Sequence, residues 1–434
     1  MHQDLDPLLF THQDPDWMVR LRGIREAIEA ATFFEDGSPQ DRQLTEIVGG
    51  VKRNGDRALI DYTEAFDKVS LTSDQFQVPE SELKTAYHQM DGALLNSIRQ
   101  AIENVRNYQR DIFIGDKNDH PGIRYTALER VGVCVPGASA PLPSTVIMTV
   151  VPAQVAGVKQ ISLVSPPRHQ GSIHPVILGI CYELGVHEVY RVGGAHAVAA
   201  LAYGTETIKP VHKIVGPGNQ WVQMAKRKLY GRVDIDSVAG PSEVLILANE
   251  QAIPAWVAAD MLSQAEHAPG SALVFTDSET FAAQVLDEVK RQVLLLGRSR
   301  ETQKSLQRFG AIVAFESIEA MIEQANAMAC EHVEIQCGDQ TQAVLEGIRH
   351  AGALFVGPFT PVAVGDYWAG PSHALPTGRS ARFFSALTSN EFIKSSSIIR
   401  YDQDMLHSCA ADVIRLAMVE GLDAHANSIK IRQG

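Results

Sequence analysis

The run VGVCVPG at residues 131–137 consists of apolar and small residues and is closed by a Pro-Gly turn. Three similar runs follow it, and a helical pattern separates each from the next: QISLVSPP (160–167), EVYRVGGA (188–195) and HKIVGPGN (212–219). Continuous apolar strands that alternate with helices are typical of β-α-β units, whose parallel sheet is buried on both faces. The four runs therefore predict a parallel α/β sheet.

A second series of apolar runs lies further along the chain and predicts a second parallel sheet. Its members are SEVLILA (242–248), SALVFTD (271–277), GAIVAFES (310–317), HVEIQ (332–336) and GALFVGP (352–358). Before residue 131 the pattern is helical, because apolar residues recur at the three- and four-residue intervals of one buried helix face. These residues are Leu94, Ile98, Ile102, Val105 and Tyr108. A helix near residues 409–420 and a short tail are expected at the C-terminus.

The expected fold class is α/β, with two Rossmann-like parallel-sheet domains, no G-x-G-x-x-G fingerprint, and helical extensions at both ends. We expect four parts along the chain. They are an N-terminal helical extension (1–28), an α/β domain that carries the metal and acid/base candidates (29–130 and 242–386), a second α/β domain on the cofactor side (131–241), and a C-terminal arm (387–434).

Length and composition agree with a multidomain globular protein. The chain has 434 residues, of which 45% are hydrophobic and 21% charged, and one domain usually takes about 150 residues. Lys and Arg number 38 against 51 Asp and Glu, which gives a net charge of −13. Nucleic-acid-binding domains usually carry a basic excess, so we expect no nucleic-acid partner.

Cysteine usage and the N-terminus indicate the compartment. The five cysteines are scattered and show neither a redox nor a zinc C-x-x-C spacing, so they are expected to be buried thiols in a reducing environment. The N-terminal sequence MHQDLDPLLF lacks the basic and apolar segments of a secretory signal. The most apolar stretch, 146–164, is interrupted by polar residues, Gly and Pro and does not resemble a membrane span. We expect a soluble, cytoplasmic protein.

The turns that close the strands are the first place to search for a ligand site, because open parallel sheets bind ligands at the carboxyl ends of their strands. Gly216-Pro217-Gly218-Asn219 closes one strand and opens a helix, whose N-terminus favours anions. Gly193-Gly194 and Pro136-Gly137 occupy equivalent positions. The dinucleotide fingerprint G-x-G-x-x-G is missing, so the residues alone favour the tight turns of an ordinary α/β sheet over a nucleotide site.

Residue types that bind metals occur in several segments. Gln264 and His267 are three residues apart near the end of a helix that starts near Pro254, so both lie on one helix face. Asp366 is expected in a loop, seven residues before His373. Two histidines, an aspartate and a neutral amide oxygen would suit zinc or manganese. Ordinary polar residues of loops and surfaces remain the alternative at this point.

The dipeptide Glu331-His332 lies where a helix is expected to meet a strand. A carboxylate and an imidazole can handle different protons of one reaction, although the same dipeptide is common on exposed helix ends. A G-x-S-x-G nucleophile elbow is absent, and Gly240-Pro241-Ser242-Glu243 is not one. The sequence therefore argues against a serine hydrolase.

Taken together, six blocks of the chain resemble the histidinol dehydrogenase family from roughly residue 40 to the end. They are KIVGPGNQWVQMAKR (213–227), AGPSEVLILA (239–248), AADMLSQAEHAPGS (258–271), CEHVEIQ (330–336), VGDYWAGPSHALPTG (364–378) and VEGLDAHANSIKIR (419–432). The resemblance implies a zinc- and NAD-dependent dehydrogenase of histidine biosynthesis. It would oxidise L-histidinol to L-histidine in a four-electron reaction through an enzyme-held aldehyde.

The resemblance also implies roles for individual residues. Glu331 and His332 match the family's acid/base pair. The positions that match its ligands for one zinc ion per subunit are Gln264, His267, Asp366 and His425, which with His332 also contact the substrate. Ser242, His373 and Glu420 match further residues of the substrate pocket. The family is an intertwined homodimer, so His425 and Glu420 would complete the site of the partner subunit.

Three positions match the family's contacts with the nicotinamide cofactor, and two of them carry unusual residues. Asn219 is the residue expected. Cys134 stands where the family usually has tyrosine, and His196 stands where it usually has glutamine. Loss of an aromatic platform is expected to weaken cofactor binding by about 1 kcal/mol, whereas a histidine can still form one hydrogen bond.

Two alternative functions remain compatible with the sequence. The chain could be a paralogue that oxidises another small polar alcohol, such as a sulfonated diol. It could also be a catalytically silent binding protein that retains the fold.

Overall fold

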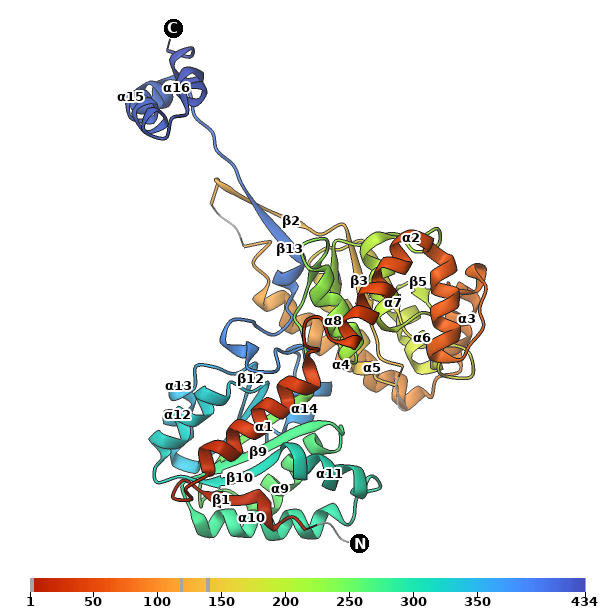
Figure 1. Ribbon diagram of the computed structural model, residues 1–434, viewed down its shortest axis with the longest axis vertical. Coiled ribbons are helices and arrows are strands. Elements are labelled where there is room, and N and C mark those ends of the chain that lie inside the picture. Colours follow the sequence, from red (N-terminus) through yellow and green to blue (C-terminus); the bar gives the residue numbers. More distant parts are fainter. Residues whose placement is uncertain (1–3, 118–119, 138–140, 434) are drawn as a thin grey trace. The chain divides into compact units, whose positions relative to one another are not determined.

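The structure is a computed structural model that describes residues 4–117, 120–137 and 141–433 (Figure 1). The chain forms two compact units. The first unit contains Met1–Phe113 and Ala127–Ile393, and the second contains Ile114–Thr126 and Lys394–Gly434. Each unit is described by itself below.

A six-stranded parallel sheet lies in the first unit, with the strand order β1-β10-β9-β8-β11-β12. Its strands are β1 (Leu9–Thr11), β8 (Ser242–Ala248), β9 (Gly270–Thr276), β10 (Gly310–Ala314), β11 (His332–Gln336) and β12 (Ala353–Val356). The five strands predicted between residues 242 and 358 are confirmed. Strand β1 was not predicted, because three residues at the sheet edge are too few to show a pattern.

Helices cover both faces of this sheet, as alternate residues of β8 show. Val244 and Ile246 pack with α9 (Pro254–Ala265), α10 (Glu279–Val293) and α11 (Ser299–Phe309). Leu245 and Leu247 pack on the other face, in the core that includes residues of α1 (Trp17–Thr32), α12 (Ile318–Met328) and α13 (Thr341–Gly347). This two-sided burial is the reason that the strands read as continuous apolar runs.

A five-stranded parallel sheet has the strand order β5-β4-β3-β6-β7. Its strands are β3 (Arg130–Cys134), β4 (Gln160–Val164), β5 (Glu188–Tyr190), β6 (Lys213–Val215) and β7 (Asp234–Ile235). The four predicted strands are confirmed, and the order is that of a Rossmann-like sheet. The chain reverses its direction of strand addition between β3 and β6, where such folds bind ligands.

Seven helices cover the five-stranded sheet. Helices α3 (Glu80–His88), α4 (Gly92–Ile112), α5 (Pro143–Val155) and α6 (Pro175–Glu183) contribute to the core on one face. Helices α2 (Pro39–Asp67), α7 (Gly194–Tyr203) and α8 (Gln220–Leu229) contribute to the core on the other. The domain boundaries given above stay a prediction, although α2 to α4, which they group with the six-stranded sheet, pack here.

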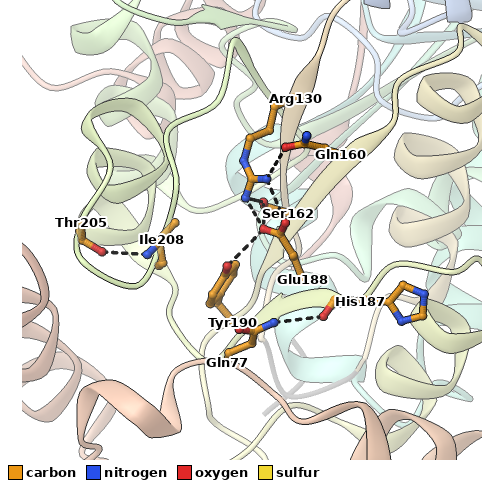
Figure 2. Close-up of polar contacts among 9 residues, drawn as sticks. All are labelled: Gln77, Arg130, Gln160, Ser162, His187, Glu188, Tyr190, Thr205 and Ile208. Carbon is orange, nitrogen blue, oxygen red and sulfur yellow. Dashed lines mark hydrogen bonds and ion pairs between the residues drawn. The ribbon is translucent and has the colours of Figure 1, made fainter.

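Polar groups join the amino ends of three strands of the five-stranded sheet (Figure 2). Arg130, the first residue of β3, is buried, and its guanidinium donates to Gln160 Oε1 at 2.9 Å, to Ser162 Oγ at 2.7 Å and to the Glu188 carboxylate. Tyr190 also donates to Glu188. Burial alone would raise the pKa of Glu188, but the hydrogen bonds and charge of Arg130 lower it below the usual value.

The second unit contains a paired strand and two helices. Strand β2 (Ile123–Ala127) pairs with β13 (Ile393–Ser397), and α15 (Gln403–Val419) and α16 (Asp423–Lys430) follow. The prediction of a tail after residue 420 is wrong, because residues 423–430 form α16, with Asp423 in its first turn and Lys430 in its last.

Two remaining features complete the fold. Helix α14 (Val362–Tyr367) follows β12, and short 3-10 helices occur at Asp6–Leu8, Ser73–Gln75, Gly338–Gln340, Ser380–Arg382 and Ser389–Phe392. Of the five cysteines, Cys134, Cys181, Cys330 and Cys337 are buried free thiols, as expected, and Cys409 is partly exposed. Within the described ranges, no helix combines the length and the apolar character that crossing a membrane requires.

Candidate functional site

The Glu331-His332 pair lies at the amino end of β11, which begins at His332. The neighbouring strand β8 begins at Ser242, and the two strands pair in parallel with His332 opposite Val244. Ser242, Glu331 and His332 therefore share the amino edge of the six-stranded sheet. This edge is opposite to the carboxyl ends of the strands, where open parallel sheets usually bind ligands. The Glu331-His332 dipeptide is a candidate from residue type alone, whereas Ser242 is a candidate only through the family resemblance.

The backbone of Glu243 fixes both members of the pair. Its amide nitrogen donates to Glu331 Oε2 at 2.8 Å, and its carbonyl oxygen lies 2.9 Å from His332 Nδ1. Because a carbonyl oxygen can only accept, Nδ1 must carry the proton. His332 Nε2 is buried and has no hydrogen-bond partner in the described part of the chain. The arrangement leaves Nε2 available to exchange a proton with a bound substrate.

Burial and neighbouring charges shift the pKa values of His332, Glu243 and His373. Burial alone would lower the pKa of His332, but Glu331 and Asp366 raise it to about 9. Burial raises the pKa of Glu243 to about 8, against the lowering effect of a hydrogen bond from the Gly378 amide. Burial lowers the pKa of His373, which stays neutral although its Nδ1 lies 3.7 Å from Asp366 Oδ1. Neutralisation of Asp366 by a cation would lower the pKa of His332 toward neutrality.

Three of the four candidate metal ligands belong to α9, its C-terminal end and α14. Gln264 is in the last turn of α9, His267 follows that helix, and Asp366 is on α14. The expectation that Asp366 lies in a loop is wrong, because residues 362–367 form this short helix. The charges of Asp366 and Glu266 both act on Tyr367, so the C-terminal ends of the two helices are close together.

The donors of this group suit a metal ion such as zinc. Gln264 is 2% exposed, and its side-chain nitrogen Nε2 has no partner within the described residues. Rotation of the amide by 180° would present the oxygen at that unpartnered position. One amide oxygen, one imidazole and one carboxylate are ligands that zinc accepts. The described residues contain no group of three or more His, Cys, Asp and Glu that could hold a metal.

The fourth candidate metal ligand, His425, and the substrate-pocket candidate Glu420 belong to the second unit. Glu420 follows α15, and His425 is in the first turn of α16. They are not brought together with Gln264, His267 and Asp366 in the structure of either unit. His373, in contrast, belongs to a segment held within the first unit, since Ser372 Oγ donates to Met148 O on α5 at 2.9 Å.

A cavity of about 550 Å³ lies at the carboxyl ends of the five-stranded sheet. Its lining includes all three cofactor candidates, Cys134, His196 and Asn219, together with Pro136-Gly137 and Gly193-Gly194. The cavity is therefore at the point where the strand order reverses, as expected for a Rossmann-like sheet. Its volume is in the range of small-molecule and cofactor sites.

Two of the three candidate cofactor residues in the cavity lining, His196 and Cys134, are uncharged. His196 is 1% exposed, with its pKa lowered to about 3 by burial and by Arg168, and its Nδ1 has no partner among the described residues. Burial raises the pKa of Cys134 to about 12, so this residue is a neutral thiol. Asn219 caps α8 and accepts from the Val222 amide at 3.2 Å. Gly216 has φ +107°, and a Cβ there would meet Cys134 O at 2.3 Å, so only glycine permits this approach.

Sequence reasoning missed three acidic residues near the pair: Glu243 and Glu334, which are buried, and Asp260, which is half-buried. Glu243 interrupts the apolar run SEVLILA, and Glu334 interrupts HVEIQ. A charged residue in a strand that is covered on both faces needs a partner. A charged residue within an apolar strand was therefore the signal in the sequence that could have identified Glu243 and Glu334.

Comparisons with known proteins agree on one family. A family model described as histidinol dehydrogenase matches residues 35–433. Histidinol dehydrogenase from Geobacillus kaustophilus is 45% identical over 422 residues, covering 95% of the chain and 99% of that relative. Histidinol dehydrogenase from Bacillus subtilis is 45% identical over 417 residues, covering 94% and 96%. The crystal structure of histidinol dehydrogenase from Elizabethkingia anophelis has a TM-score of 0.88 at 31% identity and covers 100% of the chain and 99% of its own.

Proposed function

The chain belongs to the histidinol dehydrogenase family, and from this premise we propose how its residues carry out the reaction. The protein is an oxidoreductase that oxidises L-histidinol in histidine biosynthesis. The full reaction is a four-electron oxidation to L-histidine through a bound aldehyde. The relatives reported above are all named histidinol dehydrogenases, so nothing supports the alternative in which the chain oxidises another small polar alcohol.

The observation that carries the proposed mechanism is the buried, unpartnered Nε2 of His332, an imidazole whose other nitrogen, Nδ1, lies 3.4 Å from Glu331 Oε2. His332 accepts the hydroxyl proton of the alcohol as a hydride leaves the adjacent carbon. Glu331 then accepts a proton from the water that adds to the aldehyde carbon. After His332 has released its first proton to solvent, it acts again as base when the resulting hydrate loses the second hydride. The bond from Nδ1 to Glu243 O holds the imidazole in one tautomer throughout.

A zinc ion would be held by Gln264, His267, Asp366 and His425. The orphaned amide of Gln264 and the proximity of the ends of α9 and α14 support three of these ligands. Bound zinc would position the substrate through its imidazole and amine groups. Ser242, His373 and Glu420 would contact the same substrate. Because His425 and Glu420 belong to the second unit, we propose that a homodimer completes each site with these residues from the partner subunit.

The cavity at the five-stranded sheet would bind NAD, which accepts the hydride in each of two successive oxidations. The helix N-terminus capped by Asn219, the Arg168 side chain in the lining and the free Nδ1 of His196 support this assignment. His196 would donate or accept one hydrogen bond to the cofactor, and Asn219 would contribute its amide group.

The experiment that tests the function is the stoichiometry of NADH formation under limiting L-histidinol. Zinc-loaded protein should release two NADH per L-histidinol, because both oxidations occur on one enzyme. A chelator should abolish the reaction, and added zinc should restore it. Absence of turnover with metal-loaded protein would overturn the proposed function, and a panel of small polar alcohols would then identify the substrate.

Substitution of Cys134 by tyrosine is expected to tighten NAD binding. An aromatic contact contributes about 0.5–1.5 kcal/mol, so the dissociation constant for NAD should fall by roughly twofold to tenfold. Cys134 already lines the cavity, so the ring has space on the cavity side. Equilibrium titration of protein fluorescence with NAD would measure the change. A Cys181→Ala variant, buried in α6 outside this cavity, is the control, and unchanged NAD affinity in Cys134→Tyr would contradict the role of this position.

A further inference from the structure

Three polar residues follow one face of β11, and the proposed mechanism uses only the first. His332, Glu334 and Gln336 alternate with Val333 and Ile335, which pack in the core on the α12 side. The polar residues therefore face α9, where Asp260 contacts Glu334 and Gln336. Glu334 is 1% exposed, which is unusual for a carboxyl group without a counter-cation.

Asp260 and Glu334 are joined by a hydrogen bond between their carboxyl groups. Such a bond requires a proton shared between two acids. Burial and the charge of Asp260 raise the pKa of Glu334 to about 8, and burial raises the pKa of Asp260. Gln336 Nε2 bridges the pair, since it donates to Asp260 Oδ2 at 3.0 Å and to Glu334 Oε2 at 3.4 Å. The hydrogen bond between the two acids acts to lower the pKa of Asp260 and to raise that of Glu334, which assigns the shared proton to Glu334.

The second carboxyl oxygen of Glu334 forms a hydrogen bond with a third element, α14. Glu334 Oε1 accepts from the Val362 amide at 2.9 Å, and Val362 is the first residue of α14. One carboxyl pair thus connects β11, α9 and α14. A buried carboxyl group is an unfavourable way to fill a core, because it loses its hydration. Glu334 is buried and Asp260 is half-buried, so a packing role alone gives no reason for the pair.

Each connected residue lies next to a residue of the proposed site. Asp260 is one helical turn before Gln264 on α9, and Val362 is one turn before Asp366 on α14, so each pair lies on one helix face. Glu334 is two residues after His332 and faces the same way. A displacement of either helix relative to β11 would therefore move a ligand relative to His332.

We propose that the Asp260–Glu334 pair is a positioning device that holds α9 and α14 on β11, and so sets Gln264, His267 and Asp366 in register with His332. The inference rests on the proposed zinc site. Residues that orient metal ligands typically affect metal affinity by about 10- to 100-fold when they are replaced. The pair should therefore act on zinc affinity and on the substrate, and leave the cavity on the other sheet unaffected.

Two substitutions at position 334 separate positioning from packing. Glu334→Met preserves approximate volume but removes the proton donor to Asp260 and the acceptor for Val362. Glu334→Gln keeps both, because its amide can donate to Asp260 and its oxygen can accept from Val362. The full-length, zinc-loaded proteins are mixed with a chromophoric chelator, and zinc transfer gives the metal affinity. Steady-state kinetics give kcat and the KM values for L-histidinol and NAD.

Glu334→Met is expected to bind zinc about 10- to 100-fold more weakly, with a higher KM for L-histidinol and an unchanged KM for NAD. Glu334→Gln should retain the wild-type zinc affinity and kinetics. Wild-type zinc affinity in Glu334→Met, or equal loss in both variants, would overturn the proposal. If Glu334→Met does not fold, as judged by its thermal transition, Asp260→Ala is measured in the same way and must weaken zinc binding. Wild-type protein that binds no zinc would instead overturn the proposed metal site.

Discussion

Replacement of His332 by asparagine is expected to lower kcat for L-histidinol oxidation by roughly 10²- to 10⁴-fold, the usual contribution of a positioned general base. Asparagine can still donate a hydrogen bond to Glu243 O, as Nδ1 of His332 does at 2.9 Å. It has no basic nitrogen at the position of Nε2, which is the buried atom that faces no partner in the described residues. NADH formation from L-histidinol with saturating NAD and zinc measures the effect.

Glu331→Gln provides the matched comparison for His332→Asn. Glutamine can accept from the Glu243 amide, as Glu331 Oε2 does at 2.8 Å, but it cannot accept a proton from water. The first oxidation should continue and the second should be slow, so the variant should form one NADH per L-histidinol in a single turnover. Unchanged turnover in both variants would contradict the mechanism, whereas loss of turnover in either variant would exclude the catalytically silent binding protein.

Replacement of Glu188 by alanine is expected to destabilise the five-stranded-sheet region by about 3–5 kcal/mol, because it leaves a buried charge without its partner. The side chain of Arg130 is only 5% exposed, so water cannot replace the lost carboxylate. Gln160 and Ser162 can satisfy some of its donors but supply no charge (Figure 2). The midpoint of chemical denaturation, followed by the fluorescence of Trp221 on α8, measures the loss.

Arg130→Met serves as the control for Glu188→Ala. Glu188 keeps 31% of its side chain exposed, so its carboxylate can be hydrated when the guanidinium is removed. Arg130→Met should therefore cost less than Glu188→Ala, although both break the same ion pair. Equal losses of stability in the two variants would show that the burial of Arg130 does not determine the energetic cost of breaking the ion pair.

The strands were predictable from the sequence because both sheets are buried on two faces. Nine apolar runs correspond to nine strands, and SEVLILA and HVEIQ coincide with β8 and β11 residue for residue. Short elements were not predictable: β1 has three residues, and α14 has six. Their formation depends on packing against a sheet that the local sequence does not reveal.

Residue types alone indicated candidates for the site, but their combination into one site was predicted only through the resemblance. Its residues come from the amino edge of one sheet, the end of α9 and α14, and no spacing in the sequence brings these segments together. The connecting atoms are partly backbone groups, such as the amide and carbonyl of Glu243, and these leave no trace in residue identity. The position of the cavity was easier to predict from the sequence. Glycine-containing turns close the strands that line it, and these strands lie where the strand order of a Rossmann-like sheet reverses.

The separation of the cavity from the Glu331–His332 pair has a consequence for protein engineering. The cavity is lined from the carboxyl ends of the five-stranded sheet, whereas the pair stands at the amino edge of the six-stranded sheet. Substitutions that share no partner usually combine additively. A variant library confined to the turns after β3, β5 and β6, which line the proposed NAD cavity, should therefore change NAD affinity while the contacts of Glu331 and His332 with Glu243 stay intact, so the two proposed sites can be selected in separate rounds and then recombined.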